Sequence, residues 1–219
     1  MKRRRAHAVI DQPSSAFAGF RFPPAVILLA ERGIEVDHVT LYRWVQRFTP
    51  ILADAAGPCR HAVSSRWFVD ETYVKVSGSW RYVYRAVDEE GQVIDVFVSK
   101  KRDRKIATHF FARAIGVHGR PTEVTTDRSR ALAGAINELL PDALHDTTQY
   151  ANNRVEADHR RLEARLRSMR GLKLDRTARV IVRGHAFVRN LRRGRYELGV
   201  DALPGMTLAA AFDELAIAI

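Results

Sequence analysis

Hydrophobic and polar residues alternate along most of the stretch from Trp67 to Ser99, as they do in strands that bury one face. Three runs show the pattern: WFVDETYVKV, SWRYVYRAVD and VIDVFVS. The first two runs are separated by Ser77 and Gly78, and the last two by EEGQ, and both separators favour turns. The pattern predicts three antiparallel strands joined by tight turns.

The period changes after the third strand. Ile106, Phe110, Phe111 and Ala114 recur at helical spacing, which predicts a helix that ends before Gly119. The elements expected after it are a short buried strand EVTTD, a helix over 131–140, an extended piece over 144–148 and a basic helix within 149–171. The order β-β-β-α-β-α-β-α predicts an α/β fold of the ribonuclease H-like kind, a mixed sheet flanked by helices, although other α+β folds share this order.

The N-terminal region predicts two short helices around Gly33. The first covers 25–32, and the second follows Asp37, carries apolar residues on one face and ends at Thr49 and Pro50. The pair resembles a helix-turn-helix, and a generic helical hairpin is an equal alternative. The expected organisation is a partial helix-turn-helix segment over 1–50, a linker over 51–65, the main domain over 66–200 and a C-terminal tail helix over 201–219.

Positive charge is concentrated in one part of the chain. The net charge is +11 over 219 residues, and the stretch 151–195 holds fourteen Lys or Arg against four Asp or Glu. Such a basic zone is typical of proteins that bind a polyanion, and a solvated basic face is the alternative. The single cysteine, Cys59, excludes an internal disulfide and a multi-cysteine zinc site. No membrane span or secretory signal is found, so a cytosolic protein is expected.

Three acids belong to elements that a ribonuclease H-like sheet brings together. Asp70 lies in the first strand, Asp127 ends the fourth, and Glu156 begins the basic helix. Three converging carboxylates repel one another, and a divalent cation such as Mg²⁺ or Mn²⁺ removes that conflict. Two such ions about 4 Å apart support phosphodiester cleavage or strand transfer.

Each acid also has a simpler interpretation. Asp70 is followed by Glu71, and strand alternation places only one of the two on the face that carries Phe68. Asp127 could cap a turn, and Glu156 could be an ordinary acid of a first helical turn. We expect His159, three residues after Glu156, to be a surface histidine.

The motifs WFVDETYVKV, VTTDRS, NNRVEADHRRLEARLRSMRGLK and GHAFVRNLRRGRYELGV resemble the IS-six (IS6) family of bacterial insertion-sequence transposases, from about Phe17 to the C-terminus. The resemblance implies a DDE transposase with metal ligands Asp70, Asp127 and Glu156. It also implies Mg²⁺ or Mn²⁺, double-stranded DNA with the terminal inverted repeats and a target, and a homo-oligomer on DNA, without a membrane. The basic residues expected to contact DNA are Arg43, Arg165, Arg167, Arg170, Lys173, Arg192 and Arg193.

The chain departs from the family pattern in three ways. The N-terminal module lacks a helical stretch, Glu163 stands where the family commonly has Lys, and Arg160 follows Glu156 by one helical turn. These departures leave a second hypothesis open, a catalytically impaired DNA-binding remnant of a transposase. A general ribonuclease H-like nuclease is a third.

Overall fold

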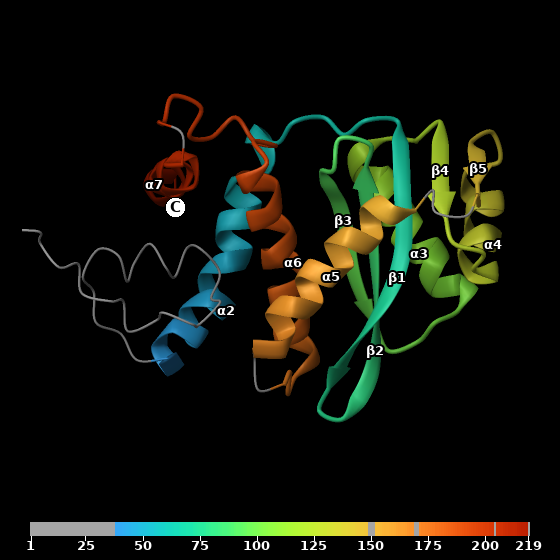
Figure 1. Cartoon of the computed structure of the whole chain (residues 1–219), viewed down its shortest axis with the longest axis horizontal. Helices are drawn as coiled ribbons and strands as arrows, with labels where there is room; N and C mark the ends of the chain where they lie inside the picture. Colours follow the sequence, from blue (N-terminus) through green and yellow to red (C-terminus); the bar gives the residue numbers. More distant parts are fainter. Residues whose placement is uncertain (1–37, 149–151, 169–170, 204, 219) are drawn as a thin grey trace, which may run out of the picture.

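A five-stranded mixed sheet forms the centre of the computed structural model, which describes residues 38–148, 152–168, 171–203 and 205–218 (Figure 1). The strands are β1 (Arg66–Val76), β2 (Ser79–Asp88), β3 (Val93–Ser99), β4 (Glu123–Thr126) and β5 (Leu144–Asp146). Their order across the sheet is β3-β2-β1-β4-β5. The helix expected over 25–32 lies outside the described residues.

The first three strands form an antiparallel meander, whereas β4 and β5 run parallel to β1. The β1–β2 turn works because Ser77 and Gly78 both have positive φ, 47° and 79°. β1 is therefore central, with an antiparallel neighbour on one side and a parallel neighbour on the other. This topology confirms the predicted ribonuclease H-like arrangement.

Helices cover both faces of the sheet. They are α2 (His38–Ala55), α3 (Arg104–His118), α4 (Arg130–Leu139), α5 (Asn153–Ser168), α6 (Asp175–Arg192) and α7 (Thr207–Ala218), with a 3₁₀ turn at Gly57–Cys59. α3 and α4 pack on one face, and α5 and α6 pack on the other. α2 and α7 lie against α6 on the side away from the sheet. Within the part of the chain that the structure describes, no helix is long and apolar enough to cross a membrane.

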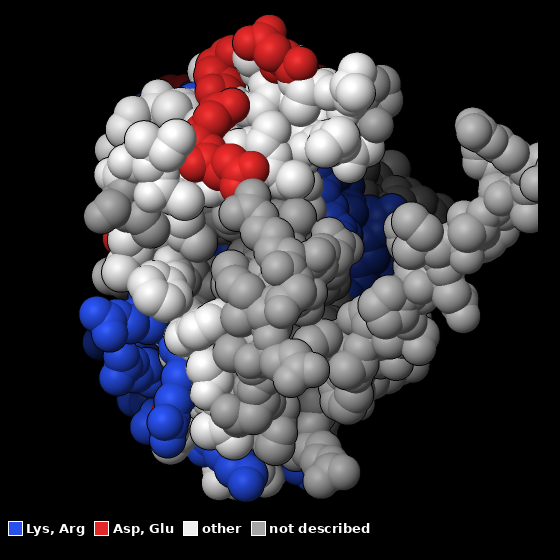
Figure 2. All heavy atoms as spheres, turned by 90° about the vertical axis from the view of Figure 1, so that its left-hand side faces the viewer, with Lys and Arg blue, Asp and Glu red and all other residues white. Residues whose placement is uncertain are grey.

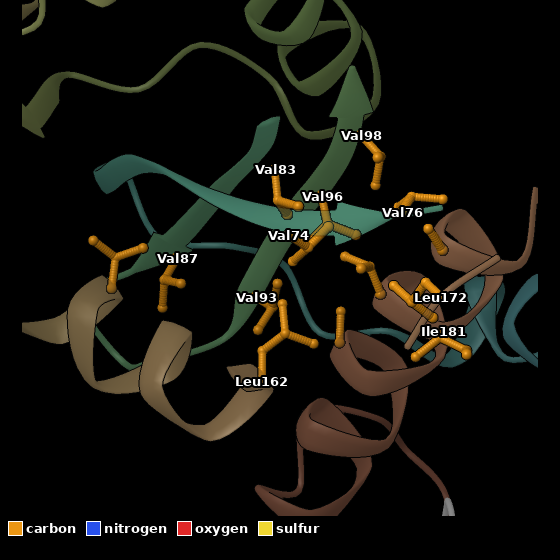
Figure 3. Packing of buried hydrophobic residues seen from close by; sticks show 14 of the residues in the cluster. Val74, Val76, Val83, Val87, Val93, Val96, Val98, Leu162, Leu172 and Ile181 are labelled. Carbon is orange, nitrogen blue, oxygen red and sulfur yellow. The ribbon is translucent and has the colours of Figure 1, made fainter. Parts of the chain in front are cut away.

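The core under α5 and α6 is built mainly of valines from β1, β2 and β3 (Figure 3). Val83 and Val74 lie in this layer, which closes against Leu162 of α5 and Ile181 of α6. β-Branched side chains suit a pleated surface, so the strand sequence provides both the strand preference and the core. The position of α5 over the sheet depends on this packing.

α6 also covers the edge strand β3. The Asn190 side chain accepts a hydrogen bond from the Val93 N–H at 2.8 Å and donates one to the Val93 carbonyl oxygen at 2.8 Å. Arg60 donates to the same carbonyl oxygen at 2.5 Å. An edge strand with open backbone groups invites pairing with other chains, and these side chains close part of that edge.

One predicted boundary is wrong. α2 does not end at Thr49 and Pro50 but continues to Ala55, so the first residues of the expected linker are helical. A proline inside a helix costs about 3 kcal/mol through a lost hydrogen bond and a steric clash. Beyond Pro50, the helix places Leu52 against the cluster shared by α6 and α7, and the fully buried Ala56 follows in the same cluster. This burial offsets the cost of the proline.

The close approach of α2 to α6 predicts a steric effect at Gly184. A Cβ atom there would lie 2.6 Å from the γ-methyl of Thr49. Gly184→Ala should therefore lower the free energy of unfolding by about 1 to 3 kcal/mol, since overpacking outweighs the better helix propensity of alanine. Urea titration measures it. In a Thr49→Ser background, which removes the methyl group, the loss should shrink. A more stable Gly184→Ala protein in the wild-type background would contradict the close packing.

Acid should destabilise the protein through His118. Burial, helped by the charge of Arg60, lowers the pKa of His118 from 6.5 to about 4. The unfolded chain therefore binds a proton that the folded chain does not, so stability falls as the pH drops from about 6.5 to about 4. The stability difference between wild type and His118→Gln, measured by urea titration, should change across this window. An unchanged difference would contradict the shift.

Candidate active site

The parallel pairing of β1 with β4 places two of the predicted acids side by side. Val69 pairs with Thr126, so the next position on each strand is Asp70 and Asp127. The Asp70 side chain is 16% exposed, whereas Asp127 lies just beyond the end of β4 and is exposed. The sheet therefore brings together two residues that are 57 positions apart in the sequence.

α5 begins next to this pair. The Asn152 side chain is buried and donates a hydrogen bond to the Val69 carbonyl oxygen at 3.0 Å, which ties the start of α5 to β1. Val155 and Leu162 are fully buried and hold the helix on the sheet. Glu156 lies in the first turn of α5 and is exposed. All three predicted acids thus belong to segments that meet at one end of the β1–β4 pair.

Both oxygens of Asp70 have contacts. Its Oδ1 accepts a hydrogen bond from the Glu71 N–H at 2.8 Å, and its Oδ2 lies 3.4 Å from Nδ1 of His159. The His159 side chain is only 7% exposed, so its prediction as a surface residue is wrong. The missed signal was the apolar stripe of α5, because His159 falls between Val155 and Leu162 at spacings of four and three.

Glu71 points to the opposite face and is held there. It forms an ion pair with Arg102, and its carboxylate also interacts with the hydroxyl of Tyr84. Burial raises the pKa of Glu71, Arg102 opposes this, and the Asp127 carboxylate adds to the rise. Of the two adjacent acids, Asp70 is thus the one on the α5 face, as strand alternation predicts.

On the β2 side of β1, a buried arginine, Arg85, lies next to Asp70. Arg85 is directly opposite Asp70 in the β1–β2 pairing and is fully buried. Its Nη2 lies 3.3 Å from Nδ1 of His185 on α6, which is itself buried.

The donor types at this end of the sheet fit a hard divalent cation, but their side chains are not gathered. Among the described residues no group of three His, Cys, Asp or Glu side chains is arranged to hold a metal ion. Oδ1 of Asp127 accepts a hydrogen bond from the Ser129 N–H at 3.0 Å, as in a turn. Carboxylate oxygens are the ligands that Mg²⁺ and Mn²⁺ prefer, and Asp127 and Glu156 are exposed enough to change rotamer.

The predicted DNA contacts lie in different surroundings. Arg43, Lys173 and Arg192 are exposed. Arg193 donates a hydrogen bond to the Gly91 carbonyl oxygen in the β2–β3 turn, which gives it a structural task. The side chains of Arg165, Arg167 and Arg170 lie outside the described residues. For all of these residues, DNA binding stays a prediction.

Comparison with known proteins gives consistent matches. A family model described as a DDE domain matches residues 64–195. The chain is 41% identical over 144 residues to the transposase for insertion sequence-like element IS431mec of Staphylococcus aureus strain Mu50, covering 63% of this chain and 64% of the relative. It is 40% identical to the transposase for insertion sequence element IS257 in transposon Tn4003 of Staphylococcus aureus, and this match also covers 63% of this chain and 64% of the relative. The matched region thus spans a little under two thirds of these relatives.

Among solved structures, the chain is similar to the catalytic core domain of HTLV-2 integrase in complex with magnesium, in its dimeric form. The TM-score is 0.45 and the sequence identity is 21%. The match covers 69% of this chain and 98% of that chain.

The hydrogen bond from Asn152 to the Val69 carbonyl oxygen should contribute to the free energy of unfolding, because it ties the start of α5 to β1. Asn152→Ala removes a buried donor and should lower the free energy of unfolding by about 1 to 2 kcal/mol. Urea titration measures the loss, and Thr147→Ala at an exposed loop position is the control that should change little. Equal stability of the two variants would show that this contact does not hold the helix.

Proposed function

Because the chain belongs to the DDE-domain family of insertion-sequence transposases, the IS6 family, we propose that it is a DNA transposase that cleaves and joins DNA strands at the ends of an insertion sequence. The observation that carries the proposal is the register of β1 and β4, which sets Asp70 beside Asp127 where α5 begins. One carboxylate within β1, one just after β4 and one in the first turn of α5 match the two Asp and one Glu that the DDE name describes.

Asp70, Asp127 and Glu156 would hold a divalent cation, Mg²⁺ or Mn²⁺. When bound, such a cation activates the attacking oxygen and stabilises the leaving oxygen in phosphodiester cleavage and strand transfer.

The surrounding residues position the carboxylates. His159 and the Glu71 N–H contact the two oxygens of Asp70 and so fix the orientation of that side chain. Arg102 pairs with Glu71 and keeps this fourth acid on the opposite face. His159 is therefore a positioning residue in this proposal, acting through Asp70.

The DNA partners follow from the same proposal. The exposed side chains of Arg43, Lys173 and Arg192 would neutralise phosphates of the element ends or of the target, with an affinity that falls as salt rises. Recognition of the inverted repeats would fall to the N-terminal segment, and the active form would be a homo-oligomer on DNA in the bacterial cytoplasm.

A second candidate function is a DNA-binding remnant without cleavage. α5 is continuous from Asn153 to Ser168, so Glu163 lies two helical turns after Glu156 on the same side. This adds an anion where a phosphate would approach. Arg160, one turn after Glu156 and exposed, is close enough in the helix to pair with that carboxylate.

The nicking of element ends tests the proposal. With Mg²⁺, the wild type should nick duplex element ends, and Asp70→Asn, Asp127→Asn and Glu156→Gln should each reduce the rate at least about 100-fold, because a metal ligand contributes several kcal/mol to the transition state. The exposed Asp142→Asn should match wild type. A chelator should abolish nicking by every protein.

Two results separate the candidates. Wild type that binds DNA but does not nick it with any divalent cation supports the remnant. Nicking by Asp127→Asn at the wild-type rate would show that the assignment of the carboxylates is wrong.

A further inference from the structure

α2 and α6 run parallel and side by side. The Tyr42 hydroxyl lies 2.8 Å from Oγ1 of Thr177, near the start of each helix. Seven residues further along both helices, Thr49 faces Gly184. The constant offset of 135 positions shows that the two helices stay in register over at least two turns. Their exposed sides therefore form one continuous surface, away from the sheet and from Asp70.

A shallow groove follows the line between these helices. Its floor consists of small or apolar groups, and its α6 side carries three arginines. The lining residues are Thr49, Pro50, Ala53, Arg176, Arg179, Val180 and Arg183. The arginines are spaced by three and four residues, so they form a single stripe along α6. All three are exposed.

Little negative charge opposes this stripe. Arg183 lies 3.6 Å from Asp54 of α2, and both side chains are largely exposed, so the pair is weak. Among the described residues, no ion pair is found for Arg176 or Arg179. Asp175 is the other acid of the two helices, and it forms ion pairs outside the groove. Its Oδ1 lies 2.7 Å from Nε of Arg81, and its Oδ2 lies 3.4 Å from Nζ of Lys100.

The α2 side of the groove adds more positive charge. Arg47 and Arg43 are exposed and lie about one and about two turns before Pro50, on the side of α2 that borders the groove. Figure 2, which views the molecule from the side of α2 and α7, shows Lys and Arg side chains at the lower left and, further back, at mid-height on the right, and Asp and Glu side chains at the top. Among the described residues, acidic and basic side chains thus lie in different parts of this face.

We propose that the groove between α2 and α6 binds the sugar-phosphate backbone of duplex DNA, through Arg176, Arg179 and Arg183. The proposal rests on the proposed function for its choice of DNA, and it adds a surface distinct from the carboxylate site. Guanidinium groups bind phosphate oxygens in a two-pronged geometry, so a row of them suits a row of phosphates.

The character of the groove favours the backbone over the bases. Apart from the Thr49 hydroxyl, the lining beside the arginines is formed by Pro50, Ala53 and Val180, whose side chains carry no hydrogen-bond donor or acceptor to read base edges. Arginine-phosphate contacts carry no sequence information. We therefore expect this surface to bind any duplex and to hold DNA while sequence recognition occurs elsewhere in the chain.

Salt dependence of DNA binding tests the proposal. The full chain is titrated, in the presence of chelator, into a fluorescent duplex of random sequence at several NaCl concentrations. For Arg176→Ala/Arg179→Ala, the slope of log K against log salt should become shallower by about 2, since each lost phosphate contact contributes about 0.9. The charge-reversed Arg176→Glu/Arg179→Glu protein should bind still more weakly.

The matched control is Lys105→Ala/Arg120→Ala, which removes two exposed positive charges from the α3 side of the sheet. Its slope should stay that of wild type, and thermal unfolding should show that all variants remain folded. Wild-type slopes for both arginine variants would overturn the proposal. Equal loss in the control would also overturn it, because the effect would then be one of net charge alone.

The two proposals fail in different ways. Chelator prevents cleavage, so an inactive carboxylate site does not affect this measurement. A wild type that binds no duplex at low salt would count against DNA as the partner altogether. DNA binding with an unchanged slope in the variants would count only against the groove.

Discussion

Parallel hydrogen bonding between β1 and β4 is the constraint on which the site depends. A shift of one residue would turn Asp70 to the face that Glu71 now occupies, because side chains alternate along a strand. Packing on both faces of β1 stabilises this register, because a shift would exchange the two buried faces. Val69 is buried against α3 and α4, and Phe68 is buried under α5. The hydrophobic core thus determines which acid faces the candidate site.

α5 carries residues of that site, and α6 packs beside α5 on the same face of the sheet. α5 brings Glu156 and His159 to the end of the β1–β4 pair, and Asn152 ties the start of the helix to β1. α6 packs beside α5 on the same valine-rich layer and at the same time supports α2 on its outer side. One helix, α6, therefore packs on the valine-rich layer with one face and carries the basic surface beside α2 with the other.

Much of the fold follows from the sequence, because alternation and turn residues define β1, β2 and β3 without help from distant contacts. The resemblance to IS6 transposases, drawn from the motifs around Asp70, Asp127 and Glu156, is confirmed by the family match. The errors arise where tertiary packing decides. Pro50 favours a helix end, yet burial beyond it keeps α2 helical, and the polarity of His159 suggests exposure, yet its position on the apolar stripe of α5 buries it. The catalytic role of the acids stays a prediction.

The central claim is that acids from two strands and one helix share a divalent cation. Anomalous diffraction from crystals of the full chain soaked in Mn²⁺ tests it most directly. The expected result is a manganese peak about 2.1 Å from carboxylate oxygens of Asp70, Asp127 and Glu156. The contradictory result is no peak there at millimolar Mn²⁺, with Asp70 still in contact with His159 and Glu156 turned into solvent.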